Sequence, residues 1–138
     1  MTAELTKSET DLVRRRYDRV APVYDAFEWL MELRFRGWRR KLWKQVDGER
    51  ILELGVGTGK NLRFYPAGKS FTAIDISEKM LDRARRKADK LGSIVELEIA
   101  DAQALPFPDD SVDSVVATFL FCSVPDPLQG LREAKRVL

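Results

Sequence analysis

Three glycines at alternate positions, Gly55, Gly57 and Gly59, follow a short and mostly apolar run at residues 51–54. The run predicts a central β-strand, and residues 61–64 beyond the glycines are suited to open a helix. A strand that leads through a glycine turn into a helix lets bare backbone approach a ligand at the carboxyl end of the strand. The first helical N–H groups then face that ligand with positive partial charge. The segment is therefore predicted to bind a nucleotide-type cofactor.

The spacing of the glycines narrows the choice of cofactor. The dinucleotide fingerprint is G-x-G-x-x-G, and here Lys60 stands at the position of its third glycine. The phosphate-binding P-loop needs a longer gap between its glycines and then Lys-Ser/Thr, which the segment lacks. Glu53 precedes the loop, and its carboxylate would repel a pyrophosphate but attract an ammonium group. The pattern favours a cofactor with an amino-acid end over one with a diphosphate.

Composition and charge limit the classes of function. The chain has 138 residues and a net charge of +2, which indicates one globular domain and gives no overall field that would attract nucleic acid. It contains no histidine, so histidine-based zinc sites and Ser-His or Cys-His nucleophile pairs within the chain are excluded, and no metal site is predicted. The single Cys122 suits a reducing compartment and is expected to be a small buried hydrophobe. With no bilayer-spanning apolar run and no signal-peptide core, we expect a cytoplasmic protein.

From residue 50 onward, predicted strands and helices alternate. Strands are predicted at residues 50–54, 70–75, 94–99 and 114–121, and helices over a short segment from Lys60, from a cap at Ser77 to Leu91, and over 128–138. This alternation predicts an α/β fold with a Rossmann-like, doubly wound parallel sheet. Two predicted domains follow from it: an N-terminal helical lid or substrate segment at residues 1–48, and a cofactor-binding domain at 49–138.

The N-terminal segment is predicted to form two helices. Pro22 should break or kink the first, and the second is predicted over residues 26–46. The apolar residues of the second helix recur at helical spacing and are expected to face the core: Leu30, Leu33, Trp38, Leu42 and Val46.

Acidic residues end two of the predicted strands. Asp75 follows Gly55 by 20 residues, where a carboxylate can accept hydrogen bonds from both ribose hydroxyls of a nucleoside cofactor. A plain helix-entry acid ahead of Ser77 is the alternative. The position of Asp75 fits NAD and S-adenosylmethionine equally well. Asp101 ends the third strand, so the two acids and the glycine loop are predicted to meet at one edge of the sheet.

Several segments carry a family resemblance. Residues 53–59, Glu-Leu-Gly-Val-Gly-Thr-Gly, resemble motif I (E/D-x-G-x-G-x-G) of the class I S-adenosylmethionine-dependent methyltransferases. Residues 110–117 resemble the family's D-x-x-F-D-x-V approach to its fourth strand, with Val112 in place of phenylalanine, and 118–125 then resemble motif IV. Residues 17–25 resemble the lid pattern Y-D-x-x-A-x-x-Y-D of small-molecule and lipid methyltransferases. The nearest group is the phospholipid N-methyltransferases and ubiquinone/menaquinone methyltransferases.

The resemblance implies an S-adenosyl-L-methionine-dependent methyltransferase that acts on a small-molecule or lipid acceptor, most simply an amine headgroup such as phosphatidylethanolamine. Asp101 would accept from the adenine amino group, unless it is only a solvated helix cap. No catalytic base is named. The predicted cofactor-binding residues are Glu53, Gly55, Val56, Gly57, Thr58, Gly59, Asn61, Asp75, Ile76, Met80, Asp101, Ala102, Gln103, Thr118 and Phe119, and the predicted substrate residues are Tyr17 and Tyr24.

The family fold has seven strands, whereas four are predicted here, so the resemblance indicates an N-terminal piece of a larger protein. The fourth strand would then be an exposed apolar edge, and edges of this kind pair with other chains, which predicts self-association. Two other classes stay open: a non-enzymatic fragment or scaffold that keeps cofactor binding, and an NAD-dependent oxidoreductase, which the glycine spacing opposes.

Residues 1–46 carry 11 Lys+Arg against 7 Asp+Glu, and the predicted helix at 26–46 mixes these cations with tryptophan. Basic amphipathic helices with tryptophan lie on anionic membrane surfaces, which predicts peripheral contact with the inner face of a membrane. A helix packed on the sheet with its charges in water is the alternative reading.

Overall fold

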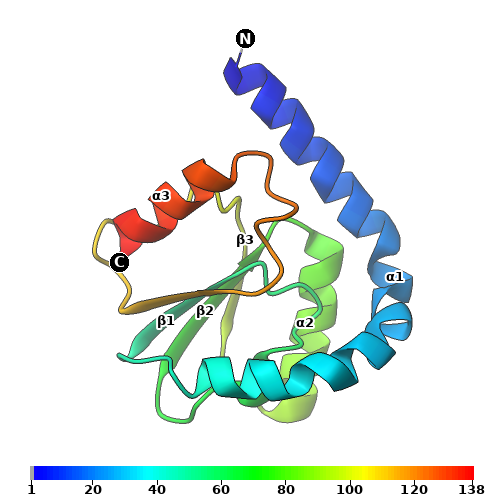
Figure 1. The fold of residues 1–138 in the computed structure, drawn as a ribbon, viewed down its shortest axis with the longest axis vertical. Coiled ribbons are helices and arrows are strands. Elements are labelled where there is room, and N and C mark those ends of the chain that lie inside the picture. The colour runs from blue at the N-terminus through cyan, green and yellow to red at the C-terminus, as the bar shows by residue number, and fades with distance from the viewer. Residues whose placement is uncertain (1) are drawn as a thin grey trace.

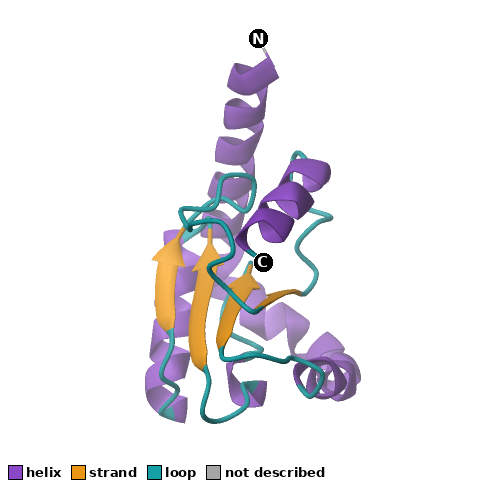
Figure 2. Cartoon of the chain, turned by 90° about the vertical axis from the view of Figure 1, so that its left-hand side faces the viewer, coloured by secondary structure: helices purple, strands orange, loops and turns teal. Residues whose placement is uncertain are grey.

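The computed structural model describes residues 2–138, apart from the side chains of residues 2–6, 25–28 and 30. Its elements are α1 (Thr2–Trp43), β1 (Arg50–Leu54), the 3-10 helix η1 (Leu62–Phe64), β2 (Ser70–Asp75), α2 (Glu78–Leu91), β3 (Glu96–Ile99), β4 (Ser114–Ala117) and α3 (Pro127–Val137). The strands form one parallel sheet in the order β3-β2-β1-β4, and Figure 2 shows their arrowheads pointing the same way. The predicted α/β, Rossmann-like parallel sheet is confirmed.

The order of the strands reverses at β1. Leu52 pairs with Thr72 on β2 and with Val115 on β4, so β1 lies between them. The chain runs from β1 through β2 to β3 on one side, and then crosses back to place β4 on the other side. In open α/β sheets ligands bind beyond the carboxyl ends of the strands, where the order reverses. The glycine loop starts at this point.

Alternate residues of β1 enter two separate cores. Leu52 and Leu54 pack with Val137 of α3 on one face of the sheet. Ile51 packs on the other face with Trp43, the last residue of α1, and with Phe71 of β2. This alternation follows from the two-residue period of a strand. It buries β1 on both faces and fixes the position of the loop that follows.

Helix α2 begins and ends as its sequence predicts. The hydroxyl of Ser77 accepts a hydrogen bond from the N–H of Met80, and Gly92 ends the helix in the left-handed conformation, with φ of +65°. Met80, Leu81, Ala84 and Ala88 are buried, whereas Leu91 lies in the last turn and is exposed.

The N-terminal segment differs from its prediction. It forms a single helix, α1, with Pro22 inside it, so the predicted break at Pro22 is wrong and only a change of direction is found (Figure 1). Figure 1 shows α1 changing direction in its middle so that its second half runs across the sheet. A proline removes one helical hydrogen bond and crowds the preceding turn, which bends a helix without ending it when both halves are packed.

The predicted core face of this segment is wrong. Leu33, Trp38 and Leu42 are 56%, 71% and 36% exposed, whereas Arg39 and Trp43 are buried. Val46 does pack against the core that contains Trp43, and the side chain of Leu30 lies outside the described residues. The helix is turned this way because Arg39 finds buried polar partners, which are described below.

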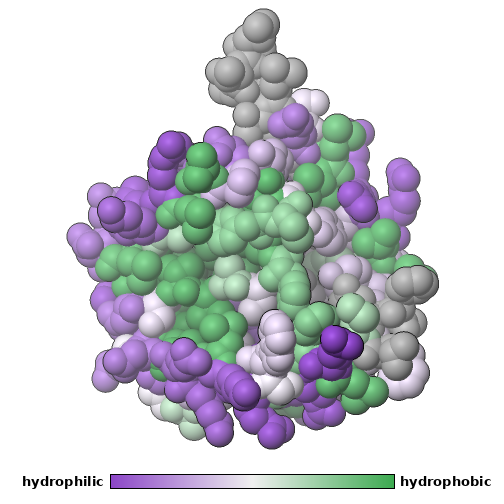
Figure 3. All heavy atoms as spheres, viewed as in Figure 1, coloured by the Kyte–Doolittle hydropathy of each residue, from purple (hydrophilic) through white to green (hydrophobic). Residues whose placement is uncertain are grey.

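Strand β4 is shorter than predicted and ends at Ala117. Phe119 has a φ of +56°, which turns the chain out of the sheet two residues later. The N–H of Ser123 then closes a turn on the carbonyl of Leu120. Figure 3 shows apolar side chains gathered on the face that carries β4 in Figure 1. The strand is an edge of the described sheet, and self-association through it stays a prediction.

Two other predicted elements are also shorter. The third strand, predicted from Ile94, begins at Glu96, and Ile94 is almost fully exposed. The helix predicted from Lys60 is only the single turn η1.

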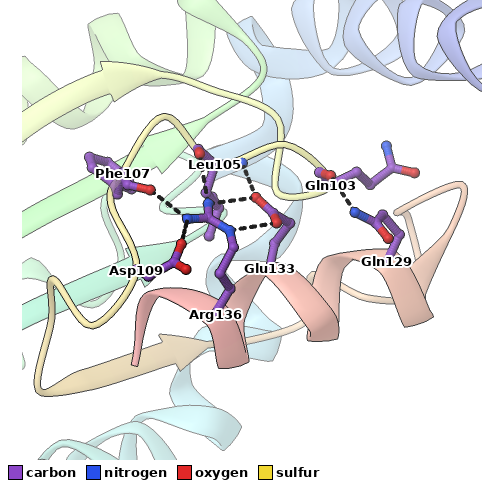
Figure 4. A network of polar contacts seen from close by, with 7 residues as sticks. All are labelled: Gln103, Leu105, Phe107, Asp109, Gln129, Glu133 and Arg136. Atoms are coloured by element: carbon purple, nitrogen blue, oxygen red, sulfur yellow. Dashed lines mark hydrogen bonds and ion pairs between the residues drawn. The ribbon is translucent and has the colours of Figure 1, made fainter.

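A polar network ties α3 to the loop that follows β3 (Figure 4). The Arg136 guanidinium donates to the carbonyls of Leu105 and Phe107 and to Asp109. Glu133 accepts from Arg136 and from the N–H of Leu105, and its bond to Arg136 holds the pKa of Glu133 below its usual range. The network holds in place the loop that begins at Asp101.

Candidate cofactor-binding site

A cavity of about 430 Å³ lies at the carboxyl ends of the strands, beneath α1. It is within the size range of small-molecule and cofactor sites. All the predicted site residues line it except Glu53 and Gly59; those that do are Tyr17, Tyr24, Gly55, Val56, Gly57, Thr58, Asn61, Asp75, Ile76, Met80, Asp101, Ala102, Gln103, Thr118 and Phe119. The fold therefore brings these residues together, and their contact with a ligand stays a prediction.

Two glycines of the loop have different roles. A Cβ on Gly57 would meet no atom within 4 Å, so its backbone faces open space in the cavity. A Cβ on Gly59 would lie 2.6 Å from Leu62 Cδ1 and 3.2 Å from Ala84 Cα. Both glycines have positive φ, of +55° and +80°. Gly57 leaves room for a ligand, whereas Gly59 allows close packing on α2.

The carboxylate of Asp75 is fixed by backbone. Oδ2 accepts from the N–H of Gly57 at 2.8 Å, and Oδ1 accepts from the N–H of Ser77 at 2.9 Å. Burial raises the pKa of Asp75, although these hydrogen bonds oppose the shift. Each oxygen keeps further acceptor capacity toward the cavity. The bond to Ser77 is the contact expected of a helix-entry acid, and contact of Asp75 with a ribose stays a prediction.

Asp101 lies in a tight polar turn. Oδ1 accepts from the N–H of Gln103 at 2.9 Å, and both carboxylate oxygens lie 3.1 Å from Gln103 Nε2. The Gln103 side-chain oxygen accepts from the N–H of Asp126 at 2.9 Å. The side chain of Gln103 therefore braces Asp101 and the start of α3, and both Gln103 and Ala102 line the cavity.

The first half of α1 contacts the ends of these strands. Thr10 hydrogen-bonds with Gln103 at 3.1 Å. The Tyr17 hydroxyl lies 2.6 Å from Ser123 Oγ, and Asp18 accepts from Ser77 at 2.5 Å. These contacts join α1 to three separate loops, so α1 closes the cavity on the side away from the sheet.

The second half of α1 carries a buried cation, Arg39, that lines the cavity. Arg39 Nη1 donates to Asn61 Oδ1 at 2.8 Å and to Thr118 Oγ1 at 3.0 Å. Arg39 Nε lies 3.5 Å from Glu32 Oε2, and the guanidinium sits 5.3 Å from the centroid of the Phe119 ring. One side chain thus connects α1 to the glycine loop and to the segment after β4.

Glu53 lies beneath this contact. It is 1% exposed, and it accepts hydrogen bonds from Asn61 Nδ2 at 2.5 Å and from the Tyr65 hydroxyl. Burial raises the pKa of Glu53 to about 7, although those two hydrogen bonds and the charge of Arg39 oppose the shift. Glu53 does not reach the cavity, so its predicted contact with an ammonium group would pass through Asn61.

Sequence reasoning named Tyr17, Tyr24, Thr118 and Phe119, but no other individual residue that α1 and the segment after β4 contribute to the cavity wall. Arg39 looked like one of several solvated cations, and only its spacing from Phe35 and Trp43 could have placed it on their face. The missed lining residues are Thr10, Val13, Met31, Glu32, Phe35, Arg39, Lys60, Ile74, Ala100, Leu120, Cys122, Ser123, Val124 and Pro125.

Cys122 is not the buried hydrophobe that was expected. It is exposed, in the turn after β4, and its thiol lies 3.4 Å from the carbonyl oxygen of Phe119. Phe119 is itself one of the predicted cofactor-binding residues. No group of three His, Cys, Asp or Glu residues suited to a metal ion occurs in the part of the chain that the structure describes.

A parallel α/β sheet, a glycine loop at the reversal of strand order and an acid at the end of the next strand together define a Rossmann-like nucleoside-binding protein. Residues 52–138 match the family model described as a methyltransferase domain. The chain therefore belongs to this methyltransferase family, and its resemblance to the class I S-adenosylmethionine-dependent methyltransferases is confirmed.

Known relatives agree with this assignment. The chain is 42% identical over 134 residues to phosphatidylethanolamine N-methyltransferase of Cereibacter sphaeroides, an alignment that covers 94% of this chain and 64% of that protein. It is 32% identical over 136 residues to the ubiquinone/menaquinone biosynthesis C-methyltransferase UbiE of Geotalea uraniireducens, covering 91% and 58%. The chain thus spans less than two thirds of the length of both relatives.

A solved structure agrees as well. The crystal structure of a SAM-dependent methyltransferase from Thermotoga maritima, described as a possible histamine N-methyltransferase, superposes with a TM-score of 0.69 at 26% identity. The superposition covers 91% of this chain and 56% of that one.

Proposed function

We propose that this chain binds S-adenosyl-L-methionine in the cavity beneath α1 and directs its methyl group to an amine of a lipid headgroup. The observation that carries the proposal is the arrangement of Gly57, Asp75 and Asp101 around one cavity. The similarity to phosphatidylethanolamine N-methyltransferase supports the choice of acceptor.

The residues present fit this cofactor. Gly57 leaves open space in front of the loop, and Asp75 presents fixed carboxylate oxygens that can accept from ribose hydroxyls. Ile76 and Met80 offer apolar contacts beside Ala102 for the adenine. The glycine spacing opposes a dinucleotide, because Lys60 stands where the dinucleotide fingerprint has its third glycine.

Bound S-adenosylmethionine supplies a methyl group on a sulfonium, which a nucleophile of the acceptor takes by in-line attack. The protein's task is to hold the two reactants in line and to exclude water. Helix α1 does this by closing the cavity through Tyr17 and Arg39. The ammonium form of the headgroup must lose one proton to become the neutral amine that attacks, and no side chain is assigned as the general base for that step.

The second half of α1 bears on the choice of acceptor. Glu32 lines the cavity together with Phe35 and Phe119, whose rings are 5.0 Å apart. Carboxylates and aromatic rings attract cations, and the Arg39 guanidinium already contacts Glu32 and Phe119, so a cationic headgroup would compete with Arg39 for these groups. Methylation of a quinone ring carbon is the second candidate, because the similarity to UbiE supports it.

Isothermal titration with S-adenosylhomocysteine tests the cofactor. Binding is expected, and Asp75→Ala should weaken it by about 1–3 kcal/mol because the ribose loses its acceptor. The variant Asp110→Ala, an exposed acid outside the cavity, is the control. No heat at millimolar ligand would favour a scaffold without cofactor, and tighter binding of NAD would favour an oxidoreductase.

Transfer of a labelled methyl group tests the acceptor. Phosphatidylethanolamine vesicles, a demethylated quinone and a small thiol are offered in parallel. Label on phosphatidylethanolamine is expected. Label on the quinone alone would show that the acceptor atom is a ring carbon and not an amine. Label on none, with S-adenosylhomocysteine bound, would leave a cofactor-binding module without this activity.

A further inference from the structure

The described residues that line the cavity include three acids and two cations, namely Glu32, Asp75, Asp101, Arg39 and Lys60. Arg39 lies 3.5 Å from Glu32 and donates hydrogen bonds to two neutral side chains. The proposed function gives a role to the acids and to Arg39 but none to Lys60. A further cation in a cavity with an excess of carboxylates is suited to hold an anion that a ligand brings in.

The side chain of Lys60 reaches from the glycine loop to α1. Lys60 follows Gly59 directly, at the end of that loop, and its Nζ lies 4.9 Å from the centroid of the Tyr24 ring. Tyr24 belongs to α1, and neither α1 nor any other described helix is long and apolar enough to cross a membrane. Both side chains are half-buried and line the cavity. They place a cation beside an aromatic ring face, where the cofactor wall meets the cover formed by α1.

The acceptor of the proposed function carries an anion next to its amine. In phosphatidylethanolamine only an ethylene bridge and an ester oxygen separate the amine nitrogen from the phosphorus, so the phosphate enters the cavity when the amine reaches the methyl donor. A phosphate withdrawn from water among carboxylates needs a cation as its partner. Lysine serves as a point-charge partner for phosphate in many sites. The acceptor and Lys60 therefore complement each other.

We propose that Lys60 binds the phosphate of the phospholipid acceptor and so selects amines that are linked to a phosphodiester. This inference rests on the proposed function and narrows its acceptor. On binding, the Lys60 ammonium would turn from the Tyr24 ring to the phosphate, because a full negative charge attracts it more strongly than a ring quadrupole. The ring face of Tyr24 would then receive the ammonium form of the headgroup. The pair thus serves both charges of a zwitterionic headgroup.

The carboxylate of S-adenosylmethionine is the alternative anion for Lys60. S-adenosylhomocysteine carries the same carboxylate and no phosphate, so its affinity separates the two assignments. It should bind Lys60→Met as tightly as it binds the wild type. Weaker binding to Lys60→Met would assign Lys60 to the cofactor and overturn the proposal.

Titration of soluble headgroups tests the phosphate site without catalysis. Glycerophosphoethanolamine and, separately, ethanolamine are added to the protein in the presence of S-adenosylhomocysteine. The wild type should bind glycerophosphoethanolamine at least about tenfold more tightly, and Lys60→Met should remove this difference. Lys60→Arg should keep most of it, because the positive charge is retained. The control Arg63→Met removes an exposed cation of η1 outside the cavity and should behave like the wild type.

Methyl transfer gives a second readout. Phosphatidylethanolamine is compared with an analogue in which a neutral ether replaces the phosphodiester, both in micelles of a neutral detergent. Lys60→Met should lower the ratio of kcat/KM for phosphatidylethanolamine to kcat/KM for the analogue at least about tenfold, mainly through a higher KM for phosphatidylethanolamine. Circular dichroism of all variants should match the wild type.

The outcomes separate this inference from the proposed function. Equal affinity of the wild type for both headgroups, including no binding of either, would overturn the role of Lys60. Equal losses in Lys60→Met and Arg63→Met would overturn it as well, because the effect would then be one of overall charge. Binding of glycerophosphoethanolamine that depends on Lys60, without methyl transfer by the wild type, would refute the proposed function and leave the phosphate site standing.

Discussion

The two walls of the cavity are built in different ways. The sheet side is held by backbone: Gly57 and Ser77 donate their N–H groups to Asp75, which is at most 18 residues away. The α1 side is held by side chains across long separations, such as Tyr17 to Ser123 over 106 residues. A wall of backbone bonds is rigid once the sheet forms, whereas a wall of side-chain bonds can separate without unfolding it. We therefore expect the sheet wall to fix the ligand and α1 to enclose it.

The largest effect is expected from Glu53, which lies beneath the contact between the two walls, on the pH dependence of stability. The folded-state pKa of Glu53, about 7, exceeds its ordinary value of 4.5, so the folded protein holds an extra proton between these values. The free energy of unfolding should therefore fall as pH rises from about 5 to 8, by up to about 3 kcal/mol from this group. Glu53→Gln should remove that component, measured by urea unfolding at both pH values. Parallel pH slopes in the two proteins would show that Glu53 ionises freely.

Removing the cation from α1 should have the next largest effect. Arg39→Met leaves Asn61 Oδ1 without its donor and removes one of the two donors to Thr118 Oγ1, at a cost of about 2 kcal/mol in unfolding free energy. The neighbouring Arg40→Met, at an exposed position, should change stability by less than about 0.5 kcal/mol. Equal losses at both positions would mean that the buried contacts contribute no net stability.

Two glycine substitutions separate packing from binding within the sheet wall. Gly59→Ala should destabilise the fold by about 2 kcal/mol, since its Cβ meets Leu62 and Ala84 in a left-handed conformation. Gly57→Ala should cost only about 1 kcal/mol of stability. It should, however, weaken the binding of S-adenosylhomocysteine, because the new Cβ would occupy part of the cavity. Thermal unfolding and titration measure the two effects. A reversed order would contradict the separate roles of these glycines.

The smallest effect is expected at the contact between Tyr17 of α1 and Ser123. Tyr17→Phe removes the hydroxyl that lies 2.6 Å from Ser123 Oγ. It should weaken the binding of S-adenosylhomocysteine about fivefold, the equivalent of about 1 kcal/mol. The change should lie in the dissociation rate, measured by stopped-flow displacement. Adding Ser123→Ala should cause little further loss if the two groups act as one pair. Additive losses would show that Tyr17 contacts the ligand independently.

The same contrast between local and long-range contacts explains which parts of the structure could be predicted from the sequence. The bounds of β1 and β2 and the caps of α2 were predicted correctly, because they depend on neighbouring residues such as Gly55, Ser77 and Gly92. The course of α1 was not, because its rotation depends on whether Arg39 meets Asn61 and Thr118, and these lie far away in the chain. The length of β4 was overestimated because the turn at Phe119 requires a positive φ that an apolar run does not reveal.

The position of Pro22 inside α1 has a mechanical consequence. One unbroken helix touches the loop at Gln103 near its start and Asn61 near its end, so both ends of the enclosed space share a single cover. Neither end can be uncovered by a hinge between separate helices, because there is none. The bend is the place where such a cover can flex. A substitution that stiffens α1 at the bend should therefore slow the entry and exit of both reactants together.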